Sequence, residues 1–139
     1  MSGRPWRVEL AIRVRPYDVD FSGCVGNVTF LRWLEDLRAE LGEAHFPLRR
    51  MLAEGLVPTV VRTEIAYRRP VRLGEAVLGT MWVSALGAAR WTVAAEIRSG
   101  RVLAAEASQE CCFLTPGGQV ARVPGWVATS CRPVRRIES

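Results

Sequence analysis

The sequence predicts an α+β fold in which an antiparallel β-sheet of about five strands wraps around one long central helix. Three observations lead to this prediction. Residues 7–15 alternate between polar and apolar, residues 27–44 repeat apolar side chains at helical spacing, and residues 59–114 return to alternation in strand-length runs. An antiparallel sheet needs one face covered, and the single long helix is the element available to cover it. A chain of 139 residues fits one domain, which we expect to span residues 1–139.

The first strand is predicted from nearly perfect alternation. Its apolar face consists of Val8, Leu10, Ile12 and Val14, and the residues between them are mostly charged. A period of two with one apolar face is typical of a half-buried strand.

The central helix is predicted over residues 27–44, after a loop with glycines at positions 23 and 26. Its apolar stripe consists of Phe30, Leu34, Leu37 and Leu41, and it is widened by Leu31 and Trp33. Asn27 is a candidate N-cap, because asparagine is favoured at that position.

Strands follow the helix almost to the end of the chain. A second short helix is expected at 47–54, stopped by Gly55. The predicted strands then cover residues 59–69, 75–86, 89–98 and 102–114, with a hairpin turn at Ser99-Gly100. The tail from Val123 is short and punctuated by prolines.

Composition excludes several kinds of chemistry. The net charge is +5, all 19 basic residues are arginine, and His45 is the only histidine. Lysine Schiff-base chemistry and two-histidine metal sites are therefore impossible, and we expect no metal site. His45 is interpreted as a helix-end residue favoured by the helix dipole.

The expected location is the cytoplasm. The sequence has neither an apolar run long enough to span a membrane nor a signal-peptide pattern at its start. The four cysteines show no metal-ligand spacing, and we expect them to be reduced.

The excess of arginine suits an anionic partner, such as a nucleotide-bearing cofactor or an acidic carrier protein. Because the arginines are dispersed along the chain, they do not indicate a nucleic-acid-binding surface.

Most of the functional information lies in residues 15–31. There a strand leads into Asp18 and Asp20, then into a glycine-bracketed loop, then into the first turn of the central helix. This order can place a carboxylate beside unpaired backbone N–H groups, which carry partial positive charge and can stabilise an oxyanion. A carboxylate next to an oxyanion site is typical of acyl-transfer hydrolases.

The chain resembles the hotdog-fold thioesterases, in particular the 4-hydroxybenzoyl-CoA thioesterase-like branch. The resemblance covers nearly the whole chain. Residues 17–25, Tyr-Asp-Val-Asp-Phe-Ser-Gly-Cys-Val, match the fixed positions of the family's Tyr/Phe-x-Asp-x-Asp-x-x-Gly-x-Val motif. Residues 65–75 resemble its second-strand segment, a Tyr-x-x-Pro followed by Gly-Asp/Glu.

This resemblance implies roles for the motif residues. Asp20 matches the catalytic carboxylate, acting as a nucleophile or as a general base toward water. The backbone at Asn27 and Val28 matches the group that polarises the thioester carbonyl. Gly23 matches the glycine that allows close approach, and Phe30 stands where relatives often carry a tyrosine.

Other motif residues are given supporting roles. Asp18 is expected to hydrogen-bond the loop. Cys24 stands where relatives carry histidine or an aliphatic residue, and as a nucleophile it is a minority interpretation.

The family also contributes pocket residues from its second strand, often across a subunit interface. Besides Phe30, the matching pocket candidates are Thr59, Arg62, Thr63 and Glu64. Arg90 lies near where relatives hold the phosphates of the nucleotide. For each of these, an ordinary strand or surface role remains open.

The resemblance implies an acyl-CoA thioesterase that works without a cofactor, as a homodimer or homotetramer. Three alternatives stay open: a thioesterase acting on an acyl carrier protein, a non-catalytic module that binds acyl thioesters, and a hydratase or dehydratase. The binding module is disfavoured because pure binding does not need a buried carboxylate, which Asp20 is expected to be. The hydratase is disfavoured because the motif loop has no histidine.

Overall fold

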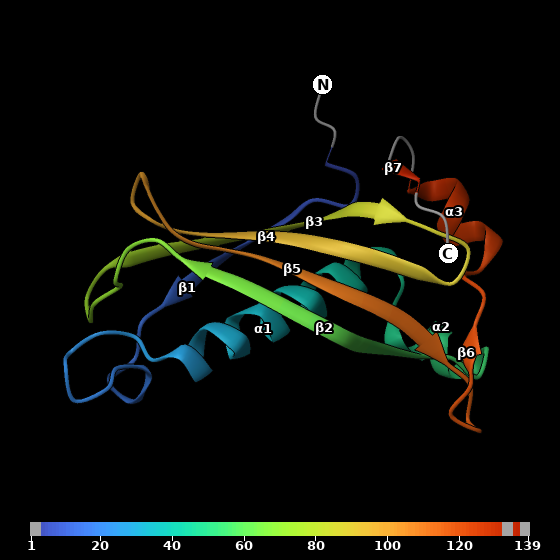
Figure 1. Cartoon of the computed structure of the whole chain (residues 1–139), viewed down its shortest axis with the longest axis horizontal. Helices are drawn as coiled ribbons and strands as arrows, with labels where there is room; N and C mark the ends of the chain where they lie inside the picture. The colour runs from blue at the N-terminus through green and yellow to red at the C-terminus, as the bar shows by residue number, and fades with distance from the viewer. Residues whose placement is uncertain (1–3, 132–134, 137–139) are drawn as a thin grey trace.

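The computed structural model describes residues 4–131 and 135–136. Figure 1 shows the arrangement of the elements. In chain order they are β1 (Val8–Arg13), η1 (Pro16–Asp18), α1 (Asn27–His45), α2 (Leu48–Ala53), β2 (Val57–Tyr67), β3 (Ala76–Leu86), β4 (Arg90–Ser99), β5 (Val102–Leu114), β6 (Val120–Ala121), α3 (Gly125–Ser130) and β7 (Arg135–Arg136).

The five long strands form one antiparallel sheet in the order β1-β3-β4-β5-β2. The short strands β6 and β7 pair with β5 and β3 respectively. The helix α1 lies along one face of this sheet (Figure 1). The predicted sheet around one long helix is confirmed, and this is the hotdog arrangement. Among the described strands, β2 ends the order, so one of its edges is open.

The core lies between α1 and the sheet. The predicted helix stripe is confirmed, because Phe30, Leu34, Leu37 and Leu41 are at most 4% exposed. On β4 the predicted inner face is buried as well, from Trp91 to Ile97 at every second residue. The two layers are in close contact at Gly79 of β3, where an added Cβ would lie 3.0 Å from Leu37 Cδ1.

Two local predictions differ from the structure, and the tail contains an element that was not predicted. Gly26, not Asn27, is the N-cap of α1, because the backbone is extended at Gly26 and helical from Asn27 onward. Strand β2 begins at Val57 and includes Pro58, which an edge strand tolerates. The tail carries the short helix α3, whose buried Val127 packs into the core.

His45 is the last residue of α1, as predicted, and its ring also stacks on Trp6 with centroids 4.8 Å apart. A helix dipole would favour the charged form of the imidazole, whereas burial lowers the pKa of His45.

No helix in the described part of the chain is long and apolar enough to cross a membrane.

Candidate active site

The N-terminus of α1 has no side-chain cap. Gly26 holds the N-cap with φ −78° and ψ 160°, and no side chain hydrogen-bonds to the first turn there. The N–H groups of Asn27 and Val28 have no acceptor within a helix, since the first turn lacks preceding carbonyls. These positions are exposed. Because the N-cap is a glycine without a side chain, the positive end of the helix stays open to a ligand.

Asp18 fixes the loop that leads into this helix. Its side chain is buried, and Oδ2 accepts a hydrogen bond of 2.8 Å from the backbone N–H of Arg15. Its carbonyl oxygen accepts from the Gly26 N–H at 3.1 Å and from the Thr29 hydroxyl at 3.3 Å. These bonds join the end of the first strand region to the first turn of α1.

Asp20 lies in a tight turn beside that helix end. Its N–H donates to the Cys24 carbonyl at 2.8 Å, and the Gly23 N–H donates to its carbonyl at 2.9 Å. Gly23 has φ +83°, a conformation that favours glycine, although nothing lies near its missing Cβ. The turn therefore needs this glycine for its backbone angles.

The Asp20 carboxylate is exposed in this chain, so the expectation that it is buried was wrong; the buried carboxylate is Asp18. The side chain and the backbone N–H of Ser22 both donate to Asp20 Oδ1. These bonds stabilise the charged form and hold the pKa of Asp20 below its usual value.

A cleft of about 290 Å³ opens beside the helix N-terminus. Cys24, Asn27 and Phe30 line it on the helix side, and residues 67–70 close the other side. The segment after β2 is tied to the motif loop by the hydrogen bond from Val25 N–H to the Val71 carbonyl, 2.8 Å. Asp20 is not among the residues that line this cleft in one chain.

Tyr67 is a lining residue that the sequence analysis did not single out. Its ring meets Phe30 edge-on, with centroids 5.3 Å apart. Phe30 lacks a hydroxyl, and Tyr67 brings a phenol to the same aromatic pair. The Tyr-x-x-Pro pattern contained the signal, but only the fold shows that this tyrosine reaches the helix N-terminus.

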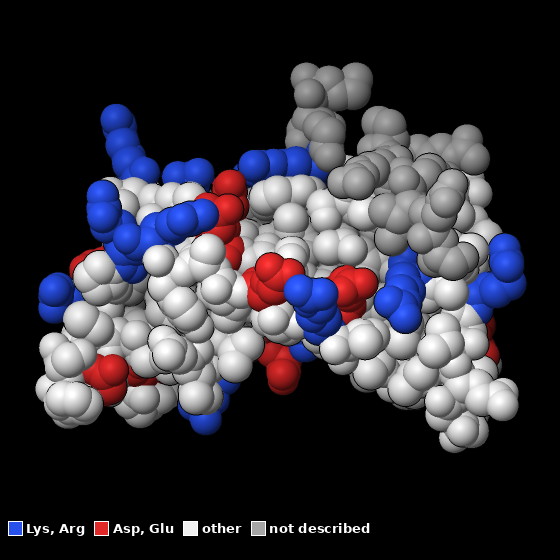
Figure 2. Space-filling model, viewed as in Figure 1, with Lys and Arg blue, Asp and Glu red and all other residues white. Residues whose placement is uncertain are grey.

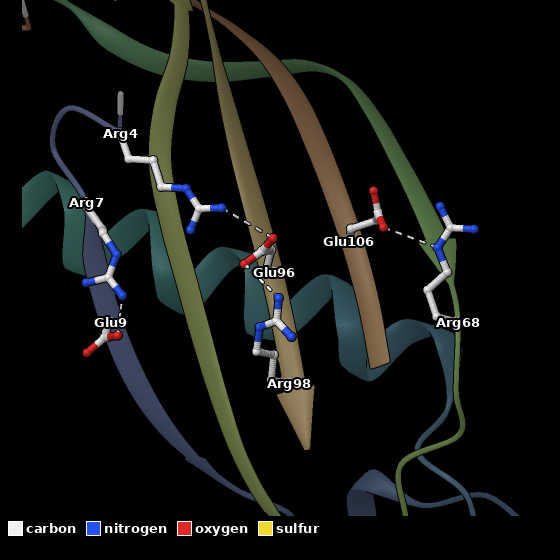
Figure 3. A network of polar contacts seen from close by, with 7 residues as sticks. All are labelled: Arg4, Arg7, Glu9, Arg68, Glu96, Arg98 and Glu106. Carbon is white, nitrogen blue, oxygen red and sulfur yellow. Dashed lines mark hydrogen bonds and ion pairs between the residues drawn. The ribbon is translucent and has the colours of Figure 1, made fainter. Parts of the chain in front are cut away.

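Arginines surround the cleft. Arg68 and Arg69 line it, and Arg72 donates a hydrogen bond of 3.4 Å to Cys24 Sγ. Arg68 is compensated by Glu106 at 3.2 Å on the outer face of the sheet (Figure 3). Arg69 has no ion pair among the described residues.

Charged residues elsewhere on the outer face are also paired. Glu96 lies 3.5 Å from both Arg4 and Arg98 (Figure 3). On the surface seen in Figure 2, arginines are spread along the molecule, with acidic side chains among them.

The structure separates the pocket residues expected on β2. Thr59 lines a second cavity on the helix side of the sheet, and Thr63 accepts a hydrogen bond from Gln109 there. Arg62 and Glu64 form an exposed ion pair of 2.9 Å, and Glu64 lines a groove with Trp82 and Glu96. In one chain, Arg62 and Glu64 are not brought to the cleft.

Arg90 also lies away from the cleft. It stands at the start of β4, level with Cys112 and Thr59, and it pairs with Glu110 at 3.6 Å. Tyr67 is eight residues farther along β2, roughly 26 Å at the rise of a strand. Within one chain, Arg90 and the N-terminus of α1 therefore lie at opposite ends of the sheet. A phosphate held by Arg90, as the sequence predicts, would be far from the cleft of the same chain.

The described residues contain no group of histidine, cysteine and carboxylate side chains that could hold a metal ion. The chemistry available around the cleft is therefore that of a carboxylate turn, open N–H groups, a thiol, a phenol and guanidinium groups.

Comparison with known proteins identifies related sequences and folds. The family model of the thioesterase-like superfamily matches residues 14–130. A thioesterase from Thermus thermophilus, solved in complex with coenzyme A and zinc, is 27% identical with a TM-score of 0.80, and the match covers 95% of each chain. A probable thioesterase from Bartonella henselae is 27% identical with a TM-score of 0.77, covering 85% of this chain and 99% of its own.

More distant structures share the fold alone. A 1,4-dihydroxy-2-naphthoyl-CoA thioesterase from Synechocystis is 20% identical with a TM-score of 0.79, covering 91% of this chain and 96% of its own. No curated protein sequence matches the chain.

Proposed function

The chain belongs to the thioesterase-like superfamily and is a thioester hydrolase of that group, and we propose that its substrate is an acyl-coenzyme A. The observation that carries this proposal is the uncapped N-terminus of α1, which opens into a cleft beside the Asp20 turn. The complex of the Thermus thermophilus thioesterase with coenzyme A supports the choice of CoA.

The proposed chemistry needs the open N-terminus of α1, which borders this cleft, and the carboxylate of the Asp20 turn, whose backbone is hydrogen-bonded to the lining residue Cys24. The thioester carbonyl accepts hydrogen bonds from the N–H groups of Asn27 and Val28, which stabilise the oxyanion of the tetrahedral intermediate. Asp20 either removes a proton from the attacking water or attacks the carbonyl itself to form a mixed anhydride. In both routes the C–S bond breaks and the thiolate of CoA takes up a proton. In the general-base route the attacking water gives the carboxylic acid directly, whereas in the nucleophilic route a water molecule then hydrolyses the mixed anhydride, which releases the acid and regenerates the Asp20 carboxylate. The reaction calls for no redox or metal cofactor.

The test is thiol release from a panel of aliphatic and aromatic acyl-CoAs. We expect Asp20→Asn to lower kcat/KM by roughly 100-fold or more. Asp36→Asn, which removes an exposed carboxylate from α1, is the matched control and should retain activity. Equal activity of Asp20→Asn and the wild type would overturn the role of Asp20. If no CoA ester reacts but an acylated carrier protein does, the carrier-protein thioesterase replaces the present proposal.

Single-turnover hydrolysis in oxygen-18 water separates the two roles of Asp20. If Asp20 is the nucleophile and water opens the anhydride at the Asp20 carboxyl carbon, the first product molecule carries an unlabelled oxygen from the carboxylate. If water opens the anhydride at the acyl carbon instead, the nucleophile is identified by an acyl-Asp20 adduct in the mass spectrum of rapidly quenched enzyme. If Asp20 is the general base, the label enters the first product directly.

Arg69 and Arg72 are the best candidates in this chain to hold the phosphates of CoA. Both lie on the segment that borders the cleft, and neither has an ion pair among the described residues. We expect Arg69→Ala and Arg72→Ala to raise KM for an acyl-CoA but not for the matching N-acetylcysteamine thioester, which lacks phosphates. Arg90→Ala belongs in the same series, and a rise in KM for this variant alone would favour the phosphate contact predicted from the sequence.

The proposed enzyme is a dimer joined through β2. This eleven-residue strand lies at an edge of the sheet, and a long open edge invites pairing with another strand. Apolar side chains are exposed along it and along the first turns of α1, including Val61 at 54% and Val28 at 61%. A second copy would cover them. The mass in solution distinguishes such a dimer from a tetramer built of two dimers.

A further inference from the structure

A second cavity lies between the middle of α1 and the Val57 end of β2. Its volume is about 100 Å³. Leu41, Phe46, Trp91 and Val93 form apolar walls, while Arg38 and Thr59 are the polar lining residues. A cavity of about this size can hold a group near the bulk of one aromatic ring or a short alkyl chain.

Arg38 is held in this cavity by buried polar partners. Its Nη1 donates a hydrogen bond of 2.8 Å to Gln109 Oε1, and Gln109 is only 3% exposed. Gln109 Nε2 in turn donates to the Thr63 hydroxyl at 3.0 Å. This chain of bonds fixes the guanidinium on the helix side of the sheet.

The charge of Arg38 is weakly compensated. The carboxylate near it among the described residues is Glu35, at 3.8 Å, and the Glu35 side chain is 76% exposed while that of Arg38 is 27% exposed. A guanidinium has five N–H donors and binds carboxylates in a bidentate manner. Arg38 therefore retains donors beside an apolar cavity, where a cation is costly unless it meets an anion.

The proposed dimer brings this cavity to a reaction centre. Two eleven-residue strands that pair antiparallel with full overlap place the Val57 end of each beside the Tyr67 end of the other. Tyr67 borders the cleft at the helix N-terminus, whereas Pro58, Thr59 and Val60 line the cavity of Arg38. The cavity of one subunit then faces the cleft of its partner.

Within one chain the same two places are farther apart. Eleven residues of α1 separate Asn27 from Arg38, roughly 16 Å along the helix. A short acyl group cannot bridge that distance, whereas in the proposed dimer the two places lie on neighbouring strands, which run about 5 Å apart.

We propose that the cavity of Arg38 receives the acyl group and that Arg38 selects compact acyl groups with a carboxylate at the far end, that is, half-thioesters of dicarboxylic acids. The inference rests on the proposed function and on the β2 dimer. The apolar walls contact the methylene groups or ring of the acyl group, and the fixed guanidinium pairs with its carboxylate.

The catalytic test compares esters that differ at the far end only. Adipoyl-CoA is compared with heptanoyl-CoA, and 4-carboxybenzoyl-CoA with 4-methylbenzoyl-CoA. The wild type should favour the carboxylate member of each pair by about tenfold or more in kcat/KM, as expected for a hydrogen-bonded ion pair. Arg38→Met should abolish or reverse this preference, and Arg38→Lys should keep part of it.

Arg32→Met is the matched control. Arg32 lies on the same helix, is exposed, and has no ion pair among the described residues, so its loss should leave the preference unchanged. If the wild type hydrolyses methyl-ended esters as well as their carboxylate partners, the inference is overturned while the proposed function stands.

A binding measurement tests the same inference without hydrolysis. Stable S-alkyl and S-carboxyalkyl thioethers of CoA are titrated calorimetrically into the wild type and Arg38→Met. Tighter binding of the carboxyalkyl thioether to the wild type, lost in Arg38→Met, supports the inference even if every ester fails to react and the proposed function falls. Equal affinities of the two thioethers for the wild type would overturn it.

Discussion

At the residue scale, the two aspartates of the motif have different surroundings. Asp18 is buried and hydrogen-bonded to the backbone on both sides of the loop, so it organises the entry into α1. Asp20 is exposed and bonded to its own turn through Ser22, so it remains available to a ligand. Two similar carboxylates two residues apart therefore have different surroundings, because Asp18 ends the short helix η1 while Asp20, after the extended Val19, begins the next turn.

The first prediction concerns Ser22 and the pH dependence of activity. In the proposed mechanism the ionised form of Asp20 is the active one, and hydrogen bonds from Ser22 hold the pKa of Asp20 below its usual value. Activity is therefore lost only as the pH falls through that lowered pKa. In Ser22→Ala the pKa of Asp20 rises, so the acidic limb of kcat/KM should move to higher pH, with little change near neutrality.

This prediction is checked by pH–rate profiles between about pH 3 and pH 7, since ordinary carboxyl groups titrate near the lower end of that range. Circular dichroism at each pH separates loss of activity from acid unfolding. If the acidic limbs of the kcat/KM profiles of Ser22→Ala and the wild type coincide, a group other than Asp20 controls the loss of activity at low pH.

The second prediction concerns Cys24. It is partly exposed and lines the cleft, whereas Cys111, Cys112 and Cys131 are buried. Burial also raises the pKa of Cys111 to about 12, which keeps it protonated and unreactive. At about pH 8, close to the ordinary pKa of a thiol, iodoacetamide should therefore modify Cys24 alone in the folded protein, and bound CoA should slow the reaction.

Mass spectrometry of intact and digested protein gives the site and the rate. Cys24→Ser is the control and should take up no label before unfolding. If CoA at saturating concentration does not protect Cys24, the cleft is not where CoA binds.

At the scale of elements, α1 packs closely against the sheet at Gly79 of β3, which has no side chain. An added Cβ at Gly79 would meet Leu37 Cδ1 at 3.0 Å and Ile12 Cδ1 at 3.1 Å. Since the core there is already filled, the helix would have to move away from the sheet or the side chains would have to leave their preferred rotamers.

The third prediction follows from that contact. Gly79→Ala should lower the free energy of unfolding by about 1–3 kcal/mol, the usual cost of overpacking a core. Gly42→Ala is the matched control in α1, where an added Cβ meets nothing within 4 Å. It should raise the free energy of unfolding by about 0.5–1 kcal/mol, because alanine favours a helix over glycine.

Urea denaturation of both variants measures these differences. A stable Gly79→Ala protein would mean that α1 can shift over β3, and the cleft at the start of α1 should then be probed for a change in KM.

At the scale of the whole molecule, the candidate site is divided between the two ends of one sheet. The cleft lies at the Tyr67 end of β2 and the cavity of Arg38 at the Val57 end. In the proposed dimer, pairing of the β2 edges brings the cleft of one subunit to the cavity of the other. Oligomeric state and activity should accordingly change together.

The fourth prediction tests this coupling with Val61, which is exposed at the β-bulge of the open strand. Val61→Lys should shift the protein toward monomer and lower kcat/KM in parallel, because charges on an edge strand oppose pairing. Val102→Lys changes a valine of similar exposure, 49%, at the β4–β5 hairpin and off the open edge of β2, and should leave the oligomeric state unchanged.

Sedimentation velocity at several protein concentrations gives the oligomeric state. A monomeric and fully active wild type, or a dimeric Val61→Lys, would contradict the β2 interface.

Much of the fold follows from local sequence pattern. The alternation from Trp91 to Ile97 and the helical spacing from Phe30 to Leu41 each predicted a buried face, and both predictions are confirmed. Side chains return to the same face every two residues in a strand and every 3.6 residues in a helix. A buried face therefore requires apolar residues at that spacing, and the sequence shows the spacing directly. The N-cap of α1 was predicted at the wrong residue. Asparagine is favoured at N-caps, but in this chain the backbone is extended at Gly26 and already helical at Asn27, so Gly26 takes the cap position.

The sequence by itself determined the kinds and order of the elements, the helix that covers the sheet, and the family motif that contains Asp20. Only the tertiary structure decided which of the two aspartates is buried, namely Asp18. It also decided that Tyr67 and Arg69 border the cleft. Finally, it placed Arg90 at the opposite end of the sheet from the cleft and Arg38 in the lining of a separate cavity. The physical reason is that local pattern reports which face of an element is buried. Which side chains from distant segments share a cavity depends instead on strand order and register, and these are set by packing across the whole sheet.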